Sequence, residues 1–146
     1  MSDVVAVRIG NQDFAVPVMQ VRDVLRRQNL TPVPLAPRAV VGLLNLRGRI
    51  ATVIDLRIRL GLPSPVAGSD AAYIVVEDGS ELYALVVDSV GDVLPIDELR
   101  LETVSRRLDP LWRAVASAVY PTARGHIVLL DTARLLDIAP ARRAAS

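Results

Sequence analysis

The sequence predicts an all-β fold, and three observations predict it: short apolar runs, turn residues between those runs, and an internal repeat. Of the 146 residues, 51% are hydrophobic and only 3% are aromatic, so Val, Leu, Ile and Ala build the core. The β-branched members of this set favour strands. A chain of this length can bury one sizeable core, so we expect a single domain over residues 1–146.

Seven apolar runs have the length of strands rather than of helices. Turn signals lie between them, such as Arg47-Gly48 and Asp78-Gly79, where Gly and Asp supply the backbone conformations that a hairpin needs. This alternation of strand and turn predicts an antiparallel sheet or barrel. The runs are residues 4–9, 14–18, 42–46, 50–54, 73–76, 82–87 and 127–130.

Two short helices are expected where an apolar run is followed by Asp, because a carboxylate can accept hydrogen bonds from the free amide groups that begin a helix. The first is predicted over residues 55–60, where Gly61 ends it. The second is predicted over residues 131–136. Both are too brief to form a helical bundle.

Three further segments are less regular. Residues 96–113 are ambiguous, because several apolar side chains have helical spacing while Asp109-Pro110 is expected to stop any helix. Residues 61–70, rich in Gly, Pro and Ser, fit a connector. The tail 139–146 is expected to be disordered.

The internal repeat aligns residues 4–25 with residues 73–94 without a gap. The aligned segments share a turn Gly, an aromatic position and an Asp-Val-Leu triplet. Apolar stretches can align by chance, but these shared landmarks favour duplication. We therefore expect two related halves, with residues 1–68 forming a first β-barrel region and residues 69–138 a second.

Composition also limits the function. The 17 basic and 16 acidic residues give a net charge of +1, which argues against nucleic acid as a partner. The absence of Cys excludes a disulfide framework and a zinc–thiolate site and favours an intracellular location. No apolar run reaches the roughly 20 residues that span a bilayer, so we expect a soluble cytoplasmic protein without membrane insertion.

The sequence does not propose an enzyme, a cofactor or a metal site. His126 is the only histidine, so any Ser-His-Asp triad would depend on it, and a strand-edge histidine is the more common situation. The acidic residues are scattered through turns rather than spaced for calcium or for glycoside hydrolysis. The glycines form no phosphate-binding loop.

Residues 42–61 form the most distinctive segment, with a strand, an Arg-Gly turn, a second strand and an Asp-capped helix in succession. Arg47 would project from the hairpin tip, and Gly48 would permit the backbone of the turn. Two interpretations of Arg47 remain open. It is either a solvated turn residue or a guanidinium that grips a carboxylate of a partner.

At this segment the sequence resembles the CheW-like family of chemotaxis coupling proteins. The resemblance rests on Asn45-Leu46-Arg47-Gly48 at the end of one strand and on Ile54-Asp55-Leu56-Arg57 at the end of the next. It covers residues 3–138 with all landmarks in order. The resemblance implies an all-β chain of two packed five-stranded SH3-like β-barrels with short capping helices.

The resemblance also implies a non-catalytic adaptor. Such proteins link a CheA-type histidine kinase, through its regulatory domain, to the cytoplasmic tips of methyl-accepting chemoreceptors in membrane-associated arrays. Receptor tips are helical hairpins, so a helix-in-groove contact is expected. The residues implied for receptor binding are Val21, Asp23, Gly42, Arg47 and Gly48, and those implied for kinase binding are Ala84 and Val93.

Several of these residues have structural explanations too. Val21 could be a core position on a short helix, and Gly42 and Gly48 could serve only to avoid a clash or a strained turn. Asp23, which replaces the family's usual Glu, could cap or pair locally with Arg26 or Arg27.

Several departures limit the resemblance, and one alternative class stays open. Thr52 stands where the family commonly has Pro, Ala114 occupies the second-half counterpart of Gly42, and residues 103–122 follow the family pattern least. The competing function is an SH3- or OB-like barrel that binds a small ligand or single-stranded nucleic acid, which would need surface aromatics in a basic groove.

Overall fold

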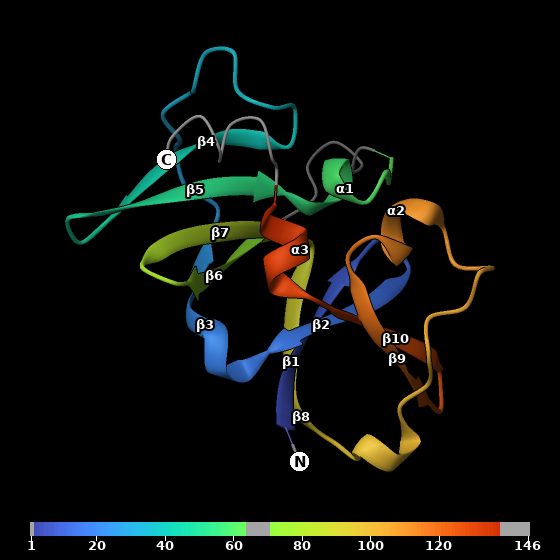
Figure 1. Cartoon of the computed structure of the whole chain (residues 1–146). Coiled ribbons are helices and arrows are strands. Elements are labelled where there is room, and N and C mark those ends of the chain that lie inside the picture. The colour runs from blue at the N-terminus through green and yellow to red at the C-terminus, as the bar shows by residue number, and fades with distance from the viewer. Residues whose placement is uncertain (1, 64–70, 138–146) are drawn as a thin grey trace.

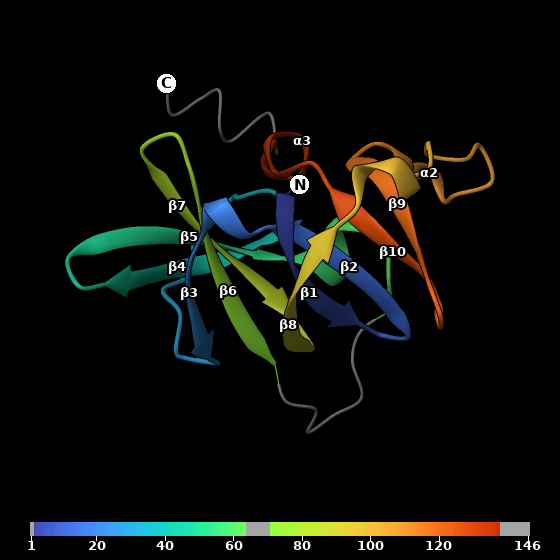
Figure 2. The same ribbon diagram turned by 90° about the horizontal axis from the view of Figure 1, so that it is seen from below.

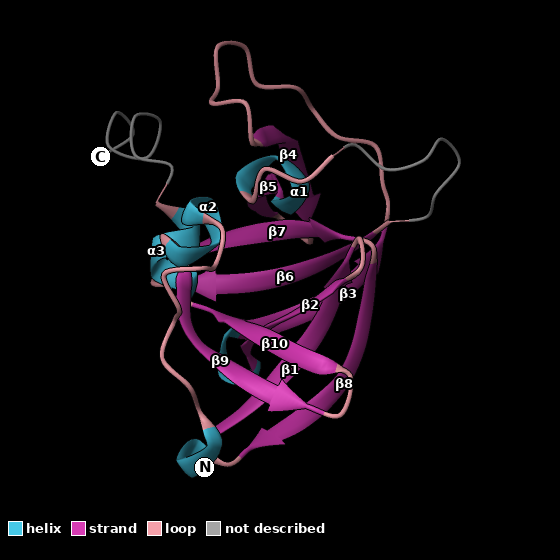
Figure 3. Cartoon of the chain, turned by 90° about the vertical axis from the view of Figure 1, so that its right-hand side faces the viewer, coloured by secondary structure: helices cyan, strands magenta, loops and turns pink. Residues whose placement is uncertain are grey.

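The computed structural model describes residues 2–63 and 71–137. In this part of the chain, strands form two five-stranded sheets, and the helices are short segments between or after strands (Figure 3). The predicted all-β class with two five-stranded sheets is thereby confirmed. Most of the expected connector and the expected disordered tail lie outside the described residues.

The first sheet has the strand order β8-β1-β2-β10-β9, and the second has the order β3-β6-β7-β5-β4. Figure 1 shows the second sheet above the first. The strands of the first sheet are β1 (Ser2–Ile9), β2 (Gln12–Pro17), β8 (Ser89–Ile96), β9 (Ala116–Thr122) and β10 (Gly125–Leu130). Those of the second are β3 (Val21–Arg26), β4 (Val40–Leu46), β5 (Arg49–Asp55), β6 (Ala72–Asp78) and β7 (Glu81–Val87).

The two sheets do not follow the expected division into residues 1–68 and 69–138, because each sheet takes strands from both halves. The exchange is reciprocal. Strand β3 of the first half pairs with β6, and β8 of the second half pairs with β1, as Figure 2 also shows. Two parallel pairs, β2 with β10 and β5 with β7, join the halves again. The repeat predicts two similar halves, but similarity does not determine which strands pair.

Both predicted capped helices are present. At α1 (Leu56–Arg59) the Asp55 carboxylate accepts a hydrogen bond from the backbone N–H of Arg57 at 2.8 Å. At α3 (Thr132–Leu136) the Asp131 carboxylate accepts one from the backbone N–H of Arg134 at 3.2 Å. Each cap satisfies amide groups that the first turn of a helix leaves free.

As expected, no described helix runs through Asp109-Pro110; instead, a new helix begins there. Asp109 caps α2 (Pro110–Arg113) through the backbone N–H of Leu111, and Pro110 occupies the first turn, where a missing N–H costs nothing. The described structure also holds two 3-10 turns, η1 (Val18–Gln20) and η2 (Glu98–Arg100). No α-helix forms over the apolar spacing that precedes Asp109.

Buried apolar residues form three clusters, because both faces of each sheet are covered. The largest cluster lies between the sheets and includes Ile9, Phe14, Ile54 and Leu85. A second cluster lies on the other face of the second sheet, and a third lies on the other face of the first. Each sheet therefore packs on its partner with one face and encloses a small interior with the other.

Candidate functional site

A cleft of about 370 Å³ opens at one end of the second sheet. Its lining includes Asp23 and Leu25 of β3 and Arg47 of the β4–β5 hairpin. Strands β3 and β4 are the two edges of this sheet, so the sheet curls until both edges face the same cleft. We call this feature the Arg47 cleft; its charged lining residues are Arg22, Asp23, Arg47 and Arg49, and its apolar ones are Leu25, Leu46, Val75 and Leu82.

Arg47 lines the cleft from a two-residue hairpin turn. Arg47 has a φ of 55° and Gly48 a φ of 90°, and positive φ at both central residues marks a type I′ turn. The side-chain oxygen of Asn45 accepts a hydrogen bond from the Gly48 N–H at 3.0 Å. The turn holds Arg47 in the left-handed region, which costs a residue with a Cβ about 1–2 kcal/mol.

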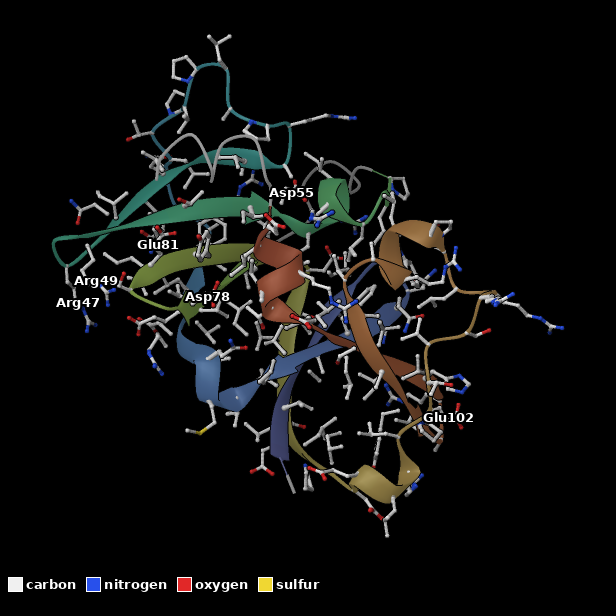
Figure 4. All side chains as sticks on the ribbon, viewed as in Figure 1. Arg47, Arg49, Asp55, Asp78, Glu81 and Glu102 are labelled. Atoms are coloured by element: carbon white, nitrogen blue, oxygen red, sulfur yellow. The ribbon has the colours of Figure 1, made fainter. Side chains whose placement is uncertain are left out.

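Arg47 and Arg49 lie at the same end of the hairpin (Figure 4). Arg47 is exposed and has no hydrogen bond or ion pair with any described residue. Arg49, by contrast, donates to the carboxylate of Glu77 at 3.2 Å and to the carbonyl oxygen of Ser80 at 3.1 Å. The hairpin therefore presents one fixed guanidinium and one that is available to a partner.

Glu77 on β6 also forms an ion pair with a second arginine. Arg22 of β3 donates from Nε to the Glu77 carboxylate at 2.7 Å. The hydrogen bonds from Arg22 and then from Arg49 hold the pKa of Glu77 below its ordinary value of 4.5. The carboxylate is therefore ionised at neutral pH and keeps both guanidinium groups beside it.

Two of the residues implied for receptor binding, Asp23 and Arg47, lie in this cleft together. Asp23 is exposed, and its carboxylate accepts a hydrogen bond from the backbone N–H of Val24 at 2.8 Å. Within the described part of the chain it makes no ion pair with Arg26 or Arg27. The register of β3 against β6 shifts between Val21 and Asp23, a β-bulge of the kind that re-aims a side chain.

The other three residues have backbone or packing roles. Val21 begins strand β3 instead of standing on a short helix, and it packs partly buried against the cluster between the sheets. Gly42 is buried, and a Cβ there would lie 2.7 Å from the Cβ of Leu30, so it permits close approach of the preceding segment. Gly48 supplies the turn. None of the three lines the Arg47 cleft.

The structure does not bring together the two residues implied for kinase binding. Ala84 is 0% exposed within the second sheet, so its side chain has no surface to offer a partner. Its position is explained by packing, because β7 is a central strand with both faces covered. Val93 lies on the edge strand β8 of the first sheet and is 53% exposed.

The model of the CheW-like domain family matches residues 3–139. The chain belongs to this family. It is 34% identical over 129 residues to the chemotaxis protein CheW of Rhizobium meliloti, an alignment that covers 88% of this chain and 83% of the relative. It is also 28% identical over 113 residues to the protein PilI of Pseudomonas aeruginosa, covering 77% and 62% respectively.

A solved structure supports the same assignment. The scaffolding protein TtCheW from Thermoanaerobacter tengcongensis superimposes with a TM-score of 0.84 at 26% identity, over 94% of each chain. The resemblance that the Asn-Leu-Arg-Gly and Ile-Asp-Leu-Arg segments carry is confirmed. In this CheW-like domain the first segment forms the tip of the β4–β5 hairpin, and the second spans the end of β5 and the start of α1.

The aromatic residues of this CheW-like domain do not form a stacking surface. Phe14, Tyr73, Tyr83 and Tyr120 are all buried, with at most 9% of each exposed. Trp112 is partly buried with its ring edge-on to Phe14. Single-stranded nucleic acid binds barrels by stacking on exposed rings, so the described surface lacks what that alternative requires.

The residues that could support chemistry are dispersed. His126 is exposed and lies 3.5 Å from the Glu102 carboxylate, which is equally exposed. No three His, Cys, Asp or Glu side chains in residues 2–63 and 71–137 lie close enough to hold a metal ion. Over the same residues, no helix is long and apolar enough to cross a membrane.

The sequence does not single out Arg22 and Arg49, which line the cleft of this CheW-like domain, or Glu77, whose carboxylate both arginines contact. Of these three residues, only Arg49 could have been predicted to lie near the site, because it directly follows the Arg47-Gly48 turn. The other two lie far apart in the chain and meet because β3 crosses to the second sheet and pairs with β6. A second cleft of about 490 Å³, lined mainly by apolar residues such as Leu43 and Tyr83, was also not foreseen.

Proposed function

We propose that this CheW-like domain is a chemotaxis adaptor that links a CheA-type histidine kinase to the cytoplasmic tips of chemoreceptors, without catalysis of its own. The relatives named chemotaxis protein CheW and the structure described as a scaffolding protein support this role. The protein would act in the cytoplasm, at membrane-associated receptor arrays.

The proposed receptor contact rests on one observation: the Arg47 cleft combines an available guanidinium with an apolar wall. An amphipathic helix of a receptor tip would place apolar side chains against Leu25, Leu46 and Leu82. A carboxylate on its rim would meet Arg47, which can bind it through two hydrogen bonds. Asp23 on the opposite rim would favour helices that carry a basic residue there.

The kinase contact would lie elsewhere. Val93 is an exposed apolar residue on the edge strand β8, and edge strands present unpaired backbone groups that another β-domain can meet. A contact at this edge would leave the Arg47 cleft open, because β8 belongs to the first sheet and the cleft to the second. An adaptor needs two such separate surfaces.

Co-sedimentation with a kinase regulatory domain and with a receptor-tip fragment tests the proposal. We expect the wild-type protein to bind both and Arg47→Glu to lose the receptor fragment while it keeps the kinase. Arg124→Glu is the matched control, since Arg124 also precedes a Gly at a hairpin tip, in the first sheet. Failure of the wild-type protein to bind the kinase would overturn the adaptor role. Full receptor binding by Arg47→Glu would overturn the assignment of the cleft.

A further inference from the structure

The carboxylate of Glu77 joins three strands of the second sheet. It accepts hydrogen bonds from Arg22 of β3 at 2.7 Å and from Arg49 of β5 at 3.2 Å, while Glu77 itself stands on β6. Strand β7 separates β6 from β5 in the sheet. The link to Arg49 therefore passes over a whole strand, which backbone pairing between neighbouring strands cannot achieve.

Both arginines are tied at a second point as well. Arg22 donates to the carbonyl oxygen of Met19 at 3.1 Å, and Arg49 donates to the carbonyl oxygen of Ser80 at 3.1 Å. Ser80 lies in the turn between β6 and β7. Each guanidinium is therefore held in one orientation by two acceptors, so that the ends of two hairpins are fixed relative to each other.

These two arginines are close in sequence to Asp23 and Arg47, the charged residues on the two rims of the Arg47 cleft. Arg22 immediately precedes Asp23, and Arg49 follows Arg47 by two positions. The two rims of the cleft belong to opposite edges of the sheet and share no backbone pairing. The carboxylate of Glu77 links them through Arg22 and Arg49.

The charges of the residues that line the cleft also point to the importance of Glu77. Among the side chains that line the cleft, Arg22, Arg47 and Arg49 outnumber the single acid Asp23. Without Glu77, Arg22 and Arg49 would repel each other across the cleft. With Glu77 in place they are neutralised in part, and Arg47 is the cation that a partner meets.

We propose that Glu77 is a positioning residue for the Arg47 cleft: it holds the β4–β5 hairpin against β3 through Arg49 and Arg22, and it thereby sets the distance between Arg47 and Asp23. This inference rests on the proposed receptor contact. The partner it fits is a helix that presents a carboxylate beside apolar side chains.

The test measures the affinity of the full-length protein for a soluble receptor-tip fragment by calorimetry, at fixed ionic strength. Glu77→Gln removes the charge and keeps the shape, and we expect the dissociation constant to rise about five- to tenfold, a size common for a residue that shapes an interface. Affinity for the kinase domain and the thermal unfolding midpoint should stay nearly unchanged, because exposed ion pairs contribute little to stability.

Two further variants separate positioning from other roles. Glu98→Gln makes the same charge change on η2, away from the second sheet, and we expect it to bind like the wild type. A double-mutant cycle with Arg49→Gln should show that Glu77→Gln has little additional effect once Arg49 is gone.

The outcomes are distinguishable. If the wild-type protein does not bind the receptor fragment, the proposed function fails, and this inference fails with it. If the wild type binds and Glu77→Gln binds equally well, only the role of Glu77 is overturned. If the two substitutions add independently in the cycle, Glu77 does not act through Arg49, which also overturns the proposal.

Discussion

The indole N–H of Trp112 donates a hydrogen bond to the carbonyl oxygen of Leu60 at 2.9 Å. This bond joins α2 to the residue that ends α1, and so connects a segment between β8 and β9 with the helix that follows β5. The ring of Trp112 also lies edge-on to Phe14, with centroids 5.1 Å apart. Trp112 therefore fastens the least regular part of the chain to the main core.

Trp112→Phe is expected to lower the free energy of unfolding by about 1 kcal/mol, because it removes one partly buried hydrogen bond while it keeps an aromatic ring. Urea unfolding followed by circular dichroism measures the change. Leu99→Ala is the control, since Leu99 is 95% exposed. A loss of equal size in both variants would contradict the role given to the Trp112 hydrogen bond.

Gly42→Ala should destabilise the fold through a steric clash. The new Cβ would lie 2.7 Å from the Cβ of Leu30 and 3.0 Å from the carbonyl oxygen of Thr31, and such overpacking costs about 1–3 kcal/mol. Gly91→Ala offers a matched comparison on β8, where the nearest atom would be 3.5 Å away. The thermal unfolding midpoints of the two variants test this prediction. Equal midpoints would show that a Cβ at position 42 causes no steric clash.

Asp88 accepts hydrogen bonds from Arg57 at 2.6 Å and 3.2 Å and from the backbone N–H of Gly10 at 2.8 Å. These contacts connect α1, the end of β7 and the β1–β2 turn. Asp88→Ala should therefore lower the free energy of unfolding by about 1.5–3 kcal/mol, the range for hydrogen bonds to charged groups. Asp88→Asn, which keeps one acceptor oxygen, should lose less in the same urea titration. An equal loss in both would mean that the charge alone is responsible.

Arg47→Asn should separate stability from binding. Asn tolerates positive φ better than Arg does, and Asn-Gly is a favoured pair in type I′ turns, so the free energy of unfolding should rise by about 0.5–1 kcal/mol. Receptor binding should fall, because the available guanidinium is gone. Chemical denaturation measures the change in stability, and calorimetry on the same sample measures the change in receptor binding. A drop in stability would show that the left-handed turn is not strained.

The contribution of Glu77 to stability should depend on pH. Its folded-state pKa lies below the ordinary 4.5 because of hydrogen bonds from Arg22 and Arg49, so the folded state binds a proton less readily than the unfolded state does. The stabilisation is therefore fully present above about pH 4.5 and disappears as the pH falls through the folded-state pKa. The difference in unfolding free energy between the wild type and Glu77→Gln is expected to be small, because the ion pairs are exposed, and it should shrink further over that range. A difference that is constant down to acidic pH would contradict it.

Much of the fold could be predicted because its strands carry strong local signals. Residues 82–87 form a continuous apolar run because both faces of β7 are covered, and Asp55 and Asp131 mark helix starts by their chemistry. Strand β3 was missed because four of its six residues are exposed, so its pattern of apolar residues is weak. Strand β8 was missed for the same reason, with a Gly and a Pro in addition.

The candidate site was predictable only where a single segment carries it. The tip at Arg47-Gly48 follows from the turn residues alone, since positive φ at both positions is a local property. The pairing of Arg22 with Glu77 depends on which strands become neighbours, and Ala84 lies in the interior because β7 is central. Neither the ion pair nor the burial can be predicted from the local sequence.

The reciprocal exchange of strands bears on how this chain acquires its shape. In the first sheet, Ala15 of β2 pairs with Leu129 of β10, and in the second, Val53 of β5 pairs with Ala84 of β7. Contacts between residues so distant in sequence make the search for the native pairing slow. A nascent chain that has emerged only as far as β7 still lacks three of the five strands of its first sheet, including the one that lies against β2. The second sheet, which consists of β3 to β7, has all its strands at that point, whereas the first sheet can be completed only after β8, β9 and β10 have left the ribosome.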